Sequence, residues 1–249
     1  MTRTVADAAL TLSVIAGLDP NDATSLDASL DDYGAAAKSG AFSVSVGFDE
    51  KYVARASNEV AAAVGNALRD LERVGARIVK VKVPDVDPVI ESWTTMAAAE
   101  ALAAHTENYP SRAAEYGPGF RSFVELGAKI SGREYADANM VRARFANRFQ
   151  QLFSQIDVLA CPSMVARTLP RESMPPDANA FRGPNPLMSF TAPFNMSRNP
   201  TLSMPCGDGA GGPPPSLQLV GRLLGEATLF RVGGAYERAT EWHKQRPTI

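Results

Sequence analysis

The chain has 249 residues and a formal net charge of −2, and hydrophobic residues make up 45% of it. This near-neutral balance offers no basic surface for nucleic acid or an anionic membrane. Its two cysteines, Cys161 and Cys206, fit a reducing compartment, and no apolar run reaches the ~18 residues needed to span a membrane. We therefore expect a cytoplasmic protein of one large domain or two small ones.

Residues 4–16 predict an amphipathic helix. Thr4 and Asp7 have the spacing of a capping box, and Gly17 can end the helix in a left-handed conformation. The apolar face is expected at Val5, Ala8, Ala9, Leu12 and Ile15. A signal peptide is the alternative interpretation, but Asp7 interrupts the apolar run and no small-residue cleavage site follows.

A strand, a helix and a second strand are expected next. Residues 42–48 alternate apolar side chains, Ser57 and Gly75 bound a helical pattern, and residues 77–84 alternate again. Such a βαβ unit predicts a parallel pair of strands in a covered sheet.

The middle of the chain is expected to be mostly helical. Helices are predicted over 86–105, 119–130 and 133–154, followed by a nearly all-apolar strand over 156–162, typical of a sheet covered on both faces. A long proline-rich loop over 162–186 comes next, and loops of that length are usually functional or mobile.

The C-terminal part predicts two strands, at 201–205 and 216–222, after a short helix or turn over 187–197, and a closing helix over 225–243. The expected fold class is therefore α/β, with a mixed central sheet covered by helices.

The usual catalytic motifs do not occur in the sequence. Residues 207–212 match GxGxxG, but three prolines follow and cannot open the helix that a dinucleotide site requires, which favours a hairpin loop. His105 and His243 are expected at helix ends, where the dipole favours a protonated imidazole. Cys161 and Cys206 are interpreted as buried, inert thiols.

One basic cluster lies on the helix expected over 133–154. Arg142, Arg144 and Arg148 are interpreted as a solvated helix face, because Val141, Phe145 and Leu152 mark another face. The sequence as a whole predicts no cofactor and no metal site.

Four segments together resemble the amidase signature family, and the likeness extends from residue 1 to about residue 247. Residues 1–27 resemble an internal segment of that family, with Arg3, Thr4, Val5 and Asp7 in the family's order. Residues 135–163 resemble its long helix running into a strand. Residues 190–207 and 215–237 resemble its two C-terminal motifs.

The resemblance implies hydrolysis of carbon–nitrogen bonds in linear amides by a serine nucleophile, a bridging serine and a lysine. In the family all three precede the segment that matches Met1, so no catalytic residue is expected in this chain. We expect residues 1–249 to be the C-terminal portion of a single amidase domain, inactive alone. A non-catalytic short module is the alternative from a different class.

The resemblance also implies a substrate pocket. The helix over 86–105 and the segment before residue 201 would wall it, with Trp93, Met96, Phe190, Phe194 and Asn195 as candidate pocket residues. The expected ligand is a small-molecule amide, and self-association into a homo-oligomer is a further expectation.

A third interpretation is an amidotransferase A subunit, which draws ammonia from glutamine for tRNA charging. Its substrate-binding acid aligns with Met188 and its substrate-binding arginine with Phe123, and neither could hold the charged ends of glutamine. The chain also departs from the family pattern at Arg198, Asn199 and Ser216, near the pocket.

Overall fold

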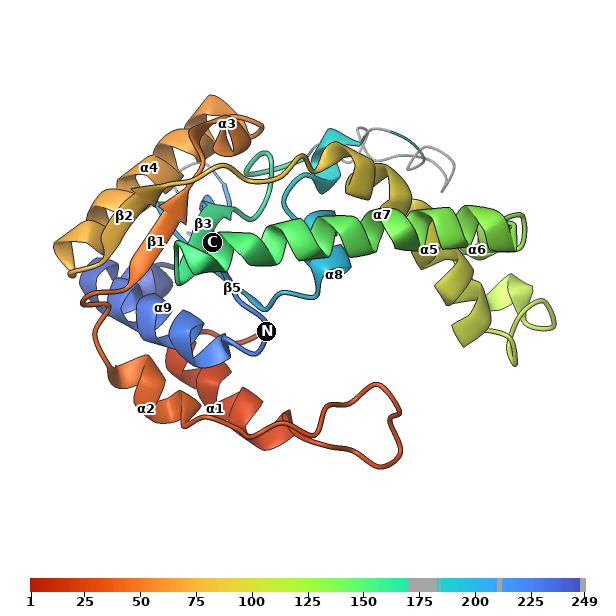
Figure 1. The fold of residues 1–249 in the computed structure, drawn as a ribbon, viewed down its shortest axis with the longest axis horizontal. Coiled ribbons are helices and arrows are strands. Elements are labelled where there is room, and N and C mark those ends of the chain that lie inside the picture. The colour runs from red at the N-terminus through yellow and green to blue at the C-terminus, as the bar shows by residue number, and fades with distance from the viewer. Residues whose placement is uncertain (170–182, 184, 210–211, 247–249) are drawn as a thin grey trace.

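The computed structural model describes residues 1–169, 183, 185–209 and 212–246. Within these residues five strands form one mixed sheet, which confirms the α/β class: β1 (Ser45–Phe48), β2 (Arg77–Lys80), β3 (Val158–Pro162), β4 (Thr201–Pro205) and β5 (Ser216–Gly221). The strand order is β2-β1-β3-β5-β4, with β1 parallel to β2 and β3, and β5 antiparallel to β3 and β4. Figure 1 shows helices packed around this sheet.

The expected βαβ unit is confirmed. Its helix is α4 (Asn58–Arg73), which Ser57 caps by accepting from the Val60 N–H, and Gly75 follows the helix with φ 95°. The first strand begins at residue 45, not 42. Ser43 has φ 65°, so the backbone is not extended there, and the Phe42 side chain is 74% exposed. The apolar alternation therefore overestimated the length of β1.

The second strand is also shorter than predicted, because a side chain takes over its hydrogen bonding. The Asp49 carboxylate accepts from the Val83 N–H at 2.7 Å and from the Tyr52 N–H at 3.1 Å. The Val81 N–H still donates to the Phe48 carbonyl of β1 at 3.0 Å, and the first Asp49 bond then takes the Val83 N–H away from β1. The second caps α3 (Glu50–Val53), a short helix that the sequence did not predict.

Each face of the sheet carries its own hydrophobic core, because successive side chains of a strand point to opposite faces. In β3, Val158 and Ala160 join one cluster, together with α4 and α9 (Glu226–Thr240). Leu159 and Cys161 join the other cluster. All five residues of β3 are buried, as expected for a sheet covered on both faces.

Three helices lie between β2 and β3 in the chain. They are α5 (Asp87–Ala104), α6 (Pro118–Gly127) and α7 (Gly132–Gln150), with short 3-10 turns η1 (Ala113–Glu115) and η2 (Gln151–Ser154). Helices α5 and α7 contribute to the core on the second face of the sheet, and α6 packs on α5. Ser131 and Glu134 form a complete capping box at the start of α7. The three helices expected from the sequence are confirmed, although the last one ends at residue 150 and continues only as a 3-10 turn.

The C-terminal elements follow the predicted order. The turn η5 (Pro186–Met188) leads to α8 (Ala192–Ser197), and β4 and β5 then form an antiparallel hairpin. The glycine-rich residues 207–212 connect these two strands, which confirms the hairpin interpretation; residues 210 and 211 lie outside the described part. Of the proline-rich loop, 170–182 and 184 also lie outside it. Glu241, with φ 56°, ends α9 before η6 (Trp242–Lys244).

The N-terminal helix α1 (Val5–Ile15) packs with α2 (Tyr33–Lys38), which the sequence did not predict, against α9. Thr4 caps α1 by accepting from the Asp7 N–H, and the Val5 N–H donates to the Glu237 carboxylate at 3.0 Å.

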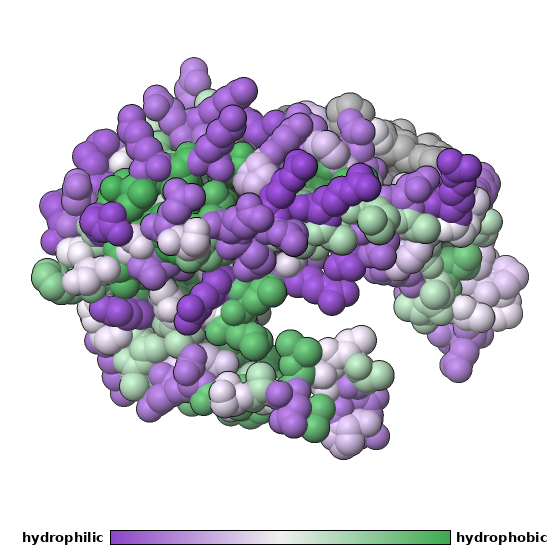
Figure 2. All heavy atoms as spheres, viewed as in Figure 1, coloured by the Kyte–Doolittle hydropathy of each residue, from purple (hydrophilic) through white to green (hydrophobic). Residues whose placement is uncertain are grey.

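The prediction that Ile15 belongs to the buried face of α1 is wrong, since its side chain is 72% exposed. The helix is apolar almost all round, so periodicity could not select the buried side. Further large apolar side chains of α1 and the loop after it are also exposed, namely Leu10, Val14, Leu18, Leu26 and Leu30. Figure 2 shows the molecule hollowed between this loop and the α5–α6 region, with hydrophobic residues gathered on the wall beside α1 and the N-terminus.

Across the part of the chain that the structure describes, no helix combines the length and apolar character needed to cross a membrane.

Candidate functional site

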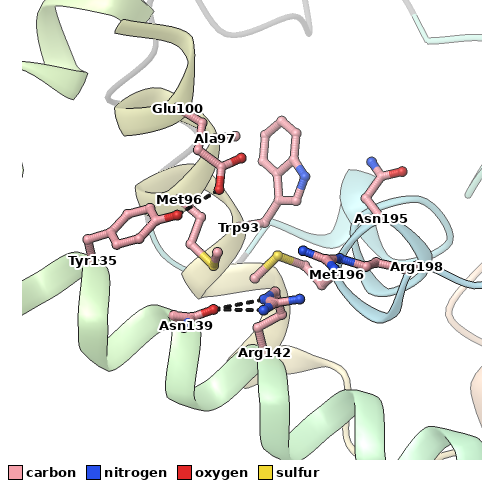
Figure 3. A pocket seen from close by; sticks show the side chains of 10 residues that line it. All are labelled: Trp93, Met96, Ala97, Glu100, Tyr135, Asn139, Arg142, Asn195, Met196 and Arg198. Atoms are coloured by element: carbon pink, nitrogen blue, oxygen red, sulfur yellow. Dashed lines mark hydrogen bonds between the residues drawn. The ribbon is translucent and has the colours of Figure 1, made fainter. Parts of the chain in front are cut away.

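A pocket of about 190 Å³ lies between α5, α7 and α8. Figure 3 shows side chains from these three helices converging on it. Ten residues line the pocket: Trp93, Met96, Ala97, Glu100, Tyr135, Asn139, Arg142, Asn195, Met196 and Arg198. Its wall combines apolar groups with a few convergent polar ones, which is the usual character of a small-molecule site.

Three of the five residues expected from the sequence meet at this pocket. Trp93 and Met96 contribute from α5, and Asn195 contributes from α8. Phe190 and Phe194 do not line it. Their side chains are 1% and 4% exposed and pack in the hydrophobic core beneath, where Phe190 lies 5.0 Å from Tyr52 between ring centroids.

The pocket carries two arginines and one carboxylate. The Asn139 side-chain oxygen accepts from Nε and Nη2 of Arg142, at 3.0 and 2.9 Å, and this pair of bonds fixes the guanidinium plane. The Tyr135 hydroxyl donates to Glu100 at 2.8 Å. Arg198 follows α8 in a left-handed conformation with φ 63°, and its backbone N–H donates to the Phe194 carbonyl at 2.8 Å.

Both arginines influence the pKa of the Tyr135 hydroxyl. The hydrogen bond to Glu100 is the largest influence and raises the pKa of the Tyr135 hydroxyl, with burial and the Glu100 charge acting in the same direction. Arg142 and Arg198 both act to lower it. Both positive charges therefore act on the Tyr135 hydroxyl, at the pocket wall.

The sequence did not identify the charged side of the pocket, although its spacing contained a signal. Tyr135, Asn139 and Arg142 stand at i, i+4 and i+7, one face of α7. Arg142 was assigned to a solvated face together with Arg144 and Arg148. In the structure Arg144 and Arg148 are exposed, but Arg142 is half-buried against the pocket. That part of the prediction is therefore corrected.

The two histidines lie at or near helix ends, and the two cysteines are buried. His105 caps the end of α5, where Nδ1 lies 2.9 Å from the Tyr116 hydroxyl, and His243 lies in η6. Cys161 and Cys206 are buried, and burial raises the pKa of each thiol to about 12. Among the residues that the structure describes, no group of three or more histidine, cysteine, aspartate or glutamate side chains could hold a metal ion.

The two positions that align with glutamine-binding residues of amidotransferases are apolar in their surroundings too. Met188 packs against the core beneath the pocket. The Phe123 ring lies 6.3 Å from Trp93 between centroids.

Comparison with known proteins identifies a matching family and relatives of this chain. The family model described as Amidase matches residues 1–230. The chain is 34% identical to the A subunit of the glutamyl-tRNA(Gln) amidotransferase from Roseiflexus sp. (strain RS-1), over 100% of the chain and 55% of that protein. It is 33% identical to an amidase of Pseudomonas putida, over 100% of the chain and 54% of that protein.

Solved structures share the fold. A bacterial aryl acylamidase of the amidase signature family superposes with a TM-score of 0.79 at 24% identity, covering 99% of this chain and 55% of that one. A 6-aminohexanoate cyclic dimer hydrolase superposes with a TM-score of 0.82 at 21% identity, with the same coverage. The chain thus spans about half the length of the proteins it matches. From the family model and these relatives, we conclude that the chain belongs to the amidase signature family.

Proposed function

We propose that this chain forms the substrate-facing part of an amidase that hydrolyses the carbon–nitrogen bond of linear amides. The observation that carries the proposal is the family match over residues 1–230, joined to a pocket between α5, α7 and α8 of the size and mixed character that suit a small amide. Trp93, Met96 and Asn195 are the proposed substrate contacts.

The catalytic serine, the bridging serine and the lysine are proposed to lie N-terminal to residue 1. In this scheme the lysine, acting through the bridging serine, takes the proton of the nucleophilic serine as that serine attacks the amide carbonyl. Backbone N–H groups stabilise the oxyanion, the proton taken up by the lysine passes to the nitrogen as the amine or ammonia leaves, and water then releases the acid from the acyl-enzyme.

The exposed apolar surface of α1 supports the proposal that another part of an amidase domain packs against this chain. The side chains of Leu10, Val14 and Ile15 are 67%, 78% and 72% exposed. Contiguous apolar surface of this kind commonly marks a contact with another protein segment. The remaining part of an amidase domain is the occupant that we propose.

Activity assays test the proposal. The 249-residue chain, purified and offered aryl and aliphatic amides, should show no turnover above background. A longer chain that adds the segment encoded in frame upstream of Met1 should hydrolyse amides, and a serine-directed acylating inhibitor should abolish that activity. Turnover by the short chain that resists the inhibitor would indicate a different chemistry.

The upstream sequence itself separates the enzyme from a non-catalytic module. A glycine- and serine-rich stretch in frame, with a lysine before it, supports the amidase. A promoter and ribosome-binding site directly before Met1 would support the module instead.

An amidotransferase A subunit is the second candidate, because the Roseiflexus relative carries that name at 34% identity. Met188 and Phe123 stand against it, since neither side chain can pair with the charged ends of glutamine. The longer chain should therefore hydrolyse a simple aryl amide at least as well as glutamine. Strong preference for glutamine would favour the amidotransferase.

A further inference from the structure

The polar side of the pocket has an unbalanced positive charge. Two guanidinium groups, those of Arg142 and Arg198, meet one carboxylate, that of Glu100, among the residues that line it. The Glu100 carboxylate is already engaged by the Tyr135 hydroxyl at 2.8 Å. Within the described residues neither guanidinium forms an ion pair with a carboxylate. The pocket therefore presents cationic donors without an anionic partner.

Both arginines leave guanidinium donors available to a ligand, although only the Arg142 side chain is held by another side chain, and Arg198 is exposed. Asn139 binds Nε and Nη2 of Arg142, which leaves Nη1 and the second Nη2 hydrogen unused by that contact. The backbone of Arg198 is fixed by its left-handed conformation and its bond to Phe194. Figure 3 shows the two guanidinium groups lying near one another beside the thioether of Met196.

Apolar side chains line the rest of the same pocket. The Trp93 indole is half-buried, and Met96 and Met196 are 6% and 4% exposed. An indole and two thioethers suit a flat or flexible apolar body, because sulfur contacts aromatic rings favourably. The pocket thus pairs an apolar wall with a cationic edge.

We infer that this pocket binds an amide whose apolar body carries a carboxylate away from the scissile bond, and that Arg142 and Arg198 hold this carboxylate. The inference rests on the proposed function where it identifies the ligand as the substrate. Arginine is suited to the role because its planar fork matches the two oxygens of a carboxylate.

A matched pair of ligands tests the inference on the 249-residue chain. The monoanilide of glutaric acid carries one carboxylate and one anilide, and its carboxamide analogue has nearly the same shape without the charge. Calorimetric titration should show the acid binding about tenfold or more tightly than the carboxamide, because hydrogen bonds to charged groups are the stronger class. The preference should weaken as salt rises from about 0.01 to 0.5 M. Equal affinities would overturn the inference without any variant.

Substitutions then assign the preference to residues. Arg142→Gln and Arg198→Gly should each remove most of it, and glycine keeps the left-handed backbone at 198 without strain. Arg144→Gln is the matched control, since Arg144 is exposed on the same helix and does not line the pocket. Arg198→Lys keeps the charge and should retain part of the preference. Unchanged preference in both Arg142→Gln and Arg198→Gly would overturn the assignment.

The same ligands separate this inference from the proposed function. If the longer chain hydrolyses neutral amides while the pocket shows no preference for the acid, the carboxylate inference alone fails. If the pocket prefers the acid but the longer chain hydrolyses no amide, the proposed function fails and the binding site stands.

Discussion

The Asp157 carboxylate accepts hydrogen bonds from both the backbone N–H and the hydroxyl of Ser45, at 2.8 and 2.6 Å. The Asp157 N–H in turn donates to the Ser45 carbonyl at 2.9 Å. The two residues stand 112 positions apart in the chain. Their contact therefore joins the start of β1 to the residue just before β3, where parallel pairing of the two strands begins.

This contact makes stability depend on pH. Burial opposes ionisation of Asp157, but the hydrogen bonds from Ser45 and the charges of Arg222 and Arg77 together outweigh it, so the pKa of the carboxyl lies below its usual value. A depressed pKa in the folded state stabilises the fold above the unfolded value of about 3.9, and this contribution is lost as the pH falls through the folded value.

We expect Asp157→Asn to lower the free energy of unfolding by about 1 kcal/mol at pH 7, because the exposed side chain is screened by water. Urea denaturation at a series of pH values should show this difference shrinking below about pH 4. A difference that stays constant down to about pH 2.5 would contradict the explanation.

Two helical glycines should respond to alanine in opposite directions. A Cβ at Gly234 in α9 would collide with the backbone carbonyl of Ala37 in α2, whereas a Cβ at Gly65 in α4 would meet no atom within 4 Å. We expect Gly234→Ala to cost about 1–3 kcal/mol or more through overpacking. Gly65→Ala should stabilise by roughly 0.5–1 kcal/mol through helix propensity. Thermal unfolding of both variants measures the contrast, and destabilisation of similar size in both would argue against it.

The two thiols should be unreactive in the folded chain. Burial raises the pKa of Cys161 and Cys206 to about 12, so the thiolate fraction at pH 8 falls about 1,000-fold compared with an exposed cysteine. A chromogenic disulfide reagent at pH 8 should label neither residue under native conditions and both in guanidinium chloride. Rapid native labelling of either thiol would show that its surroundings open.

The exposed side of α1 should bind a hydrophobic dye and promote self-association. Leu10→Gln with Val14→Lys replaces two side chains that are 67% and 78% exposed, so it should lower dye fluorescence and shift gel filtration towards the monomer. Met140→Lys is the control, because Met140 is 51% exposed but lies on α7 and not on α1. An effect of equal size from the control would locate the association elsewhere.

The βαβ unit could be predicted because each of its signals is local. The Ser57 cap, the periodic apolar residues of α4 and the left-handed position at Gly75 all act within a few residues of where they stand. Its strand ends could not be predicted so well, because a distant side chain decides them. The Asp49 carboxylate ends the pairing of β2 by binding a backbone N–H 34 positions away.

The pocket could be predicted only in part, for a similar reason. Family resemblance located the elements that carry Trp93, Met96 and Asn195, and those three residues meet in space. Arg142 was misassigned because the period of α7 shows which residues share a face but not which neighbour covers that face. The crossing of α5 and α7, which decides this, depends on contacts between residues far apart in the sequence.

None of the residues that line the pocket belongs to a strand; all come from α5, α7 and α8 or the residue that ends α8. The strands can therefore stay unchanged while this wall is rewritten, provided that Met96 and Met196, which also belong to the second core, are kept. Gene libraries randomised only at the pocket-lining positions that are not buried would sample new ligand preferences and leave the core intact; these are Trp93, Ala97, Glu100, Tyr135, Asn139, Arg142, Asn195 and Arg198. In such a fold, ligand preference can change through helix residues while the strands that form the sheet are conserved.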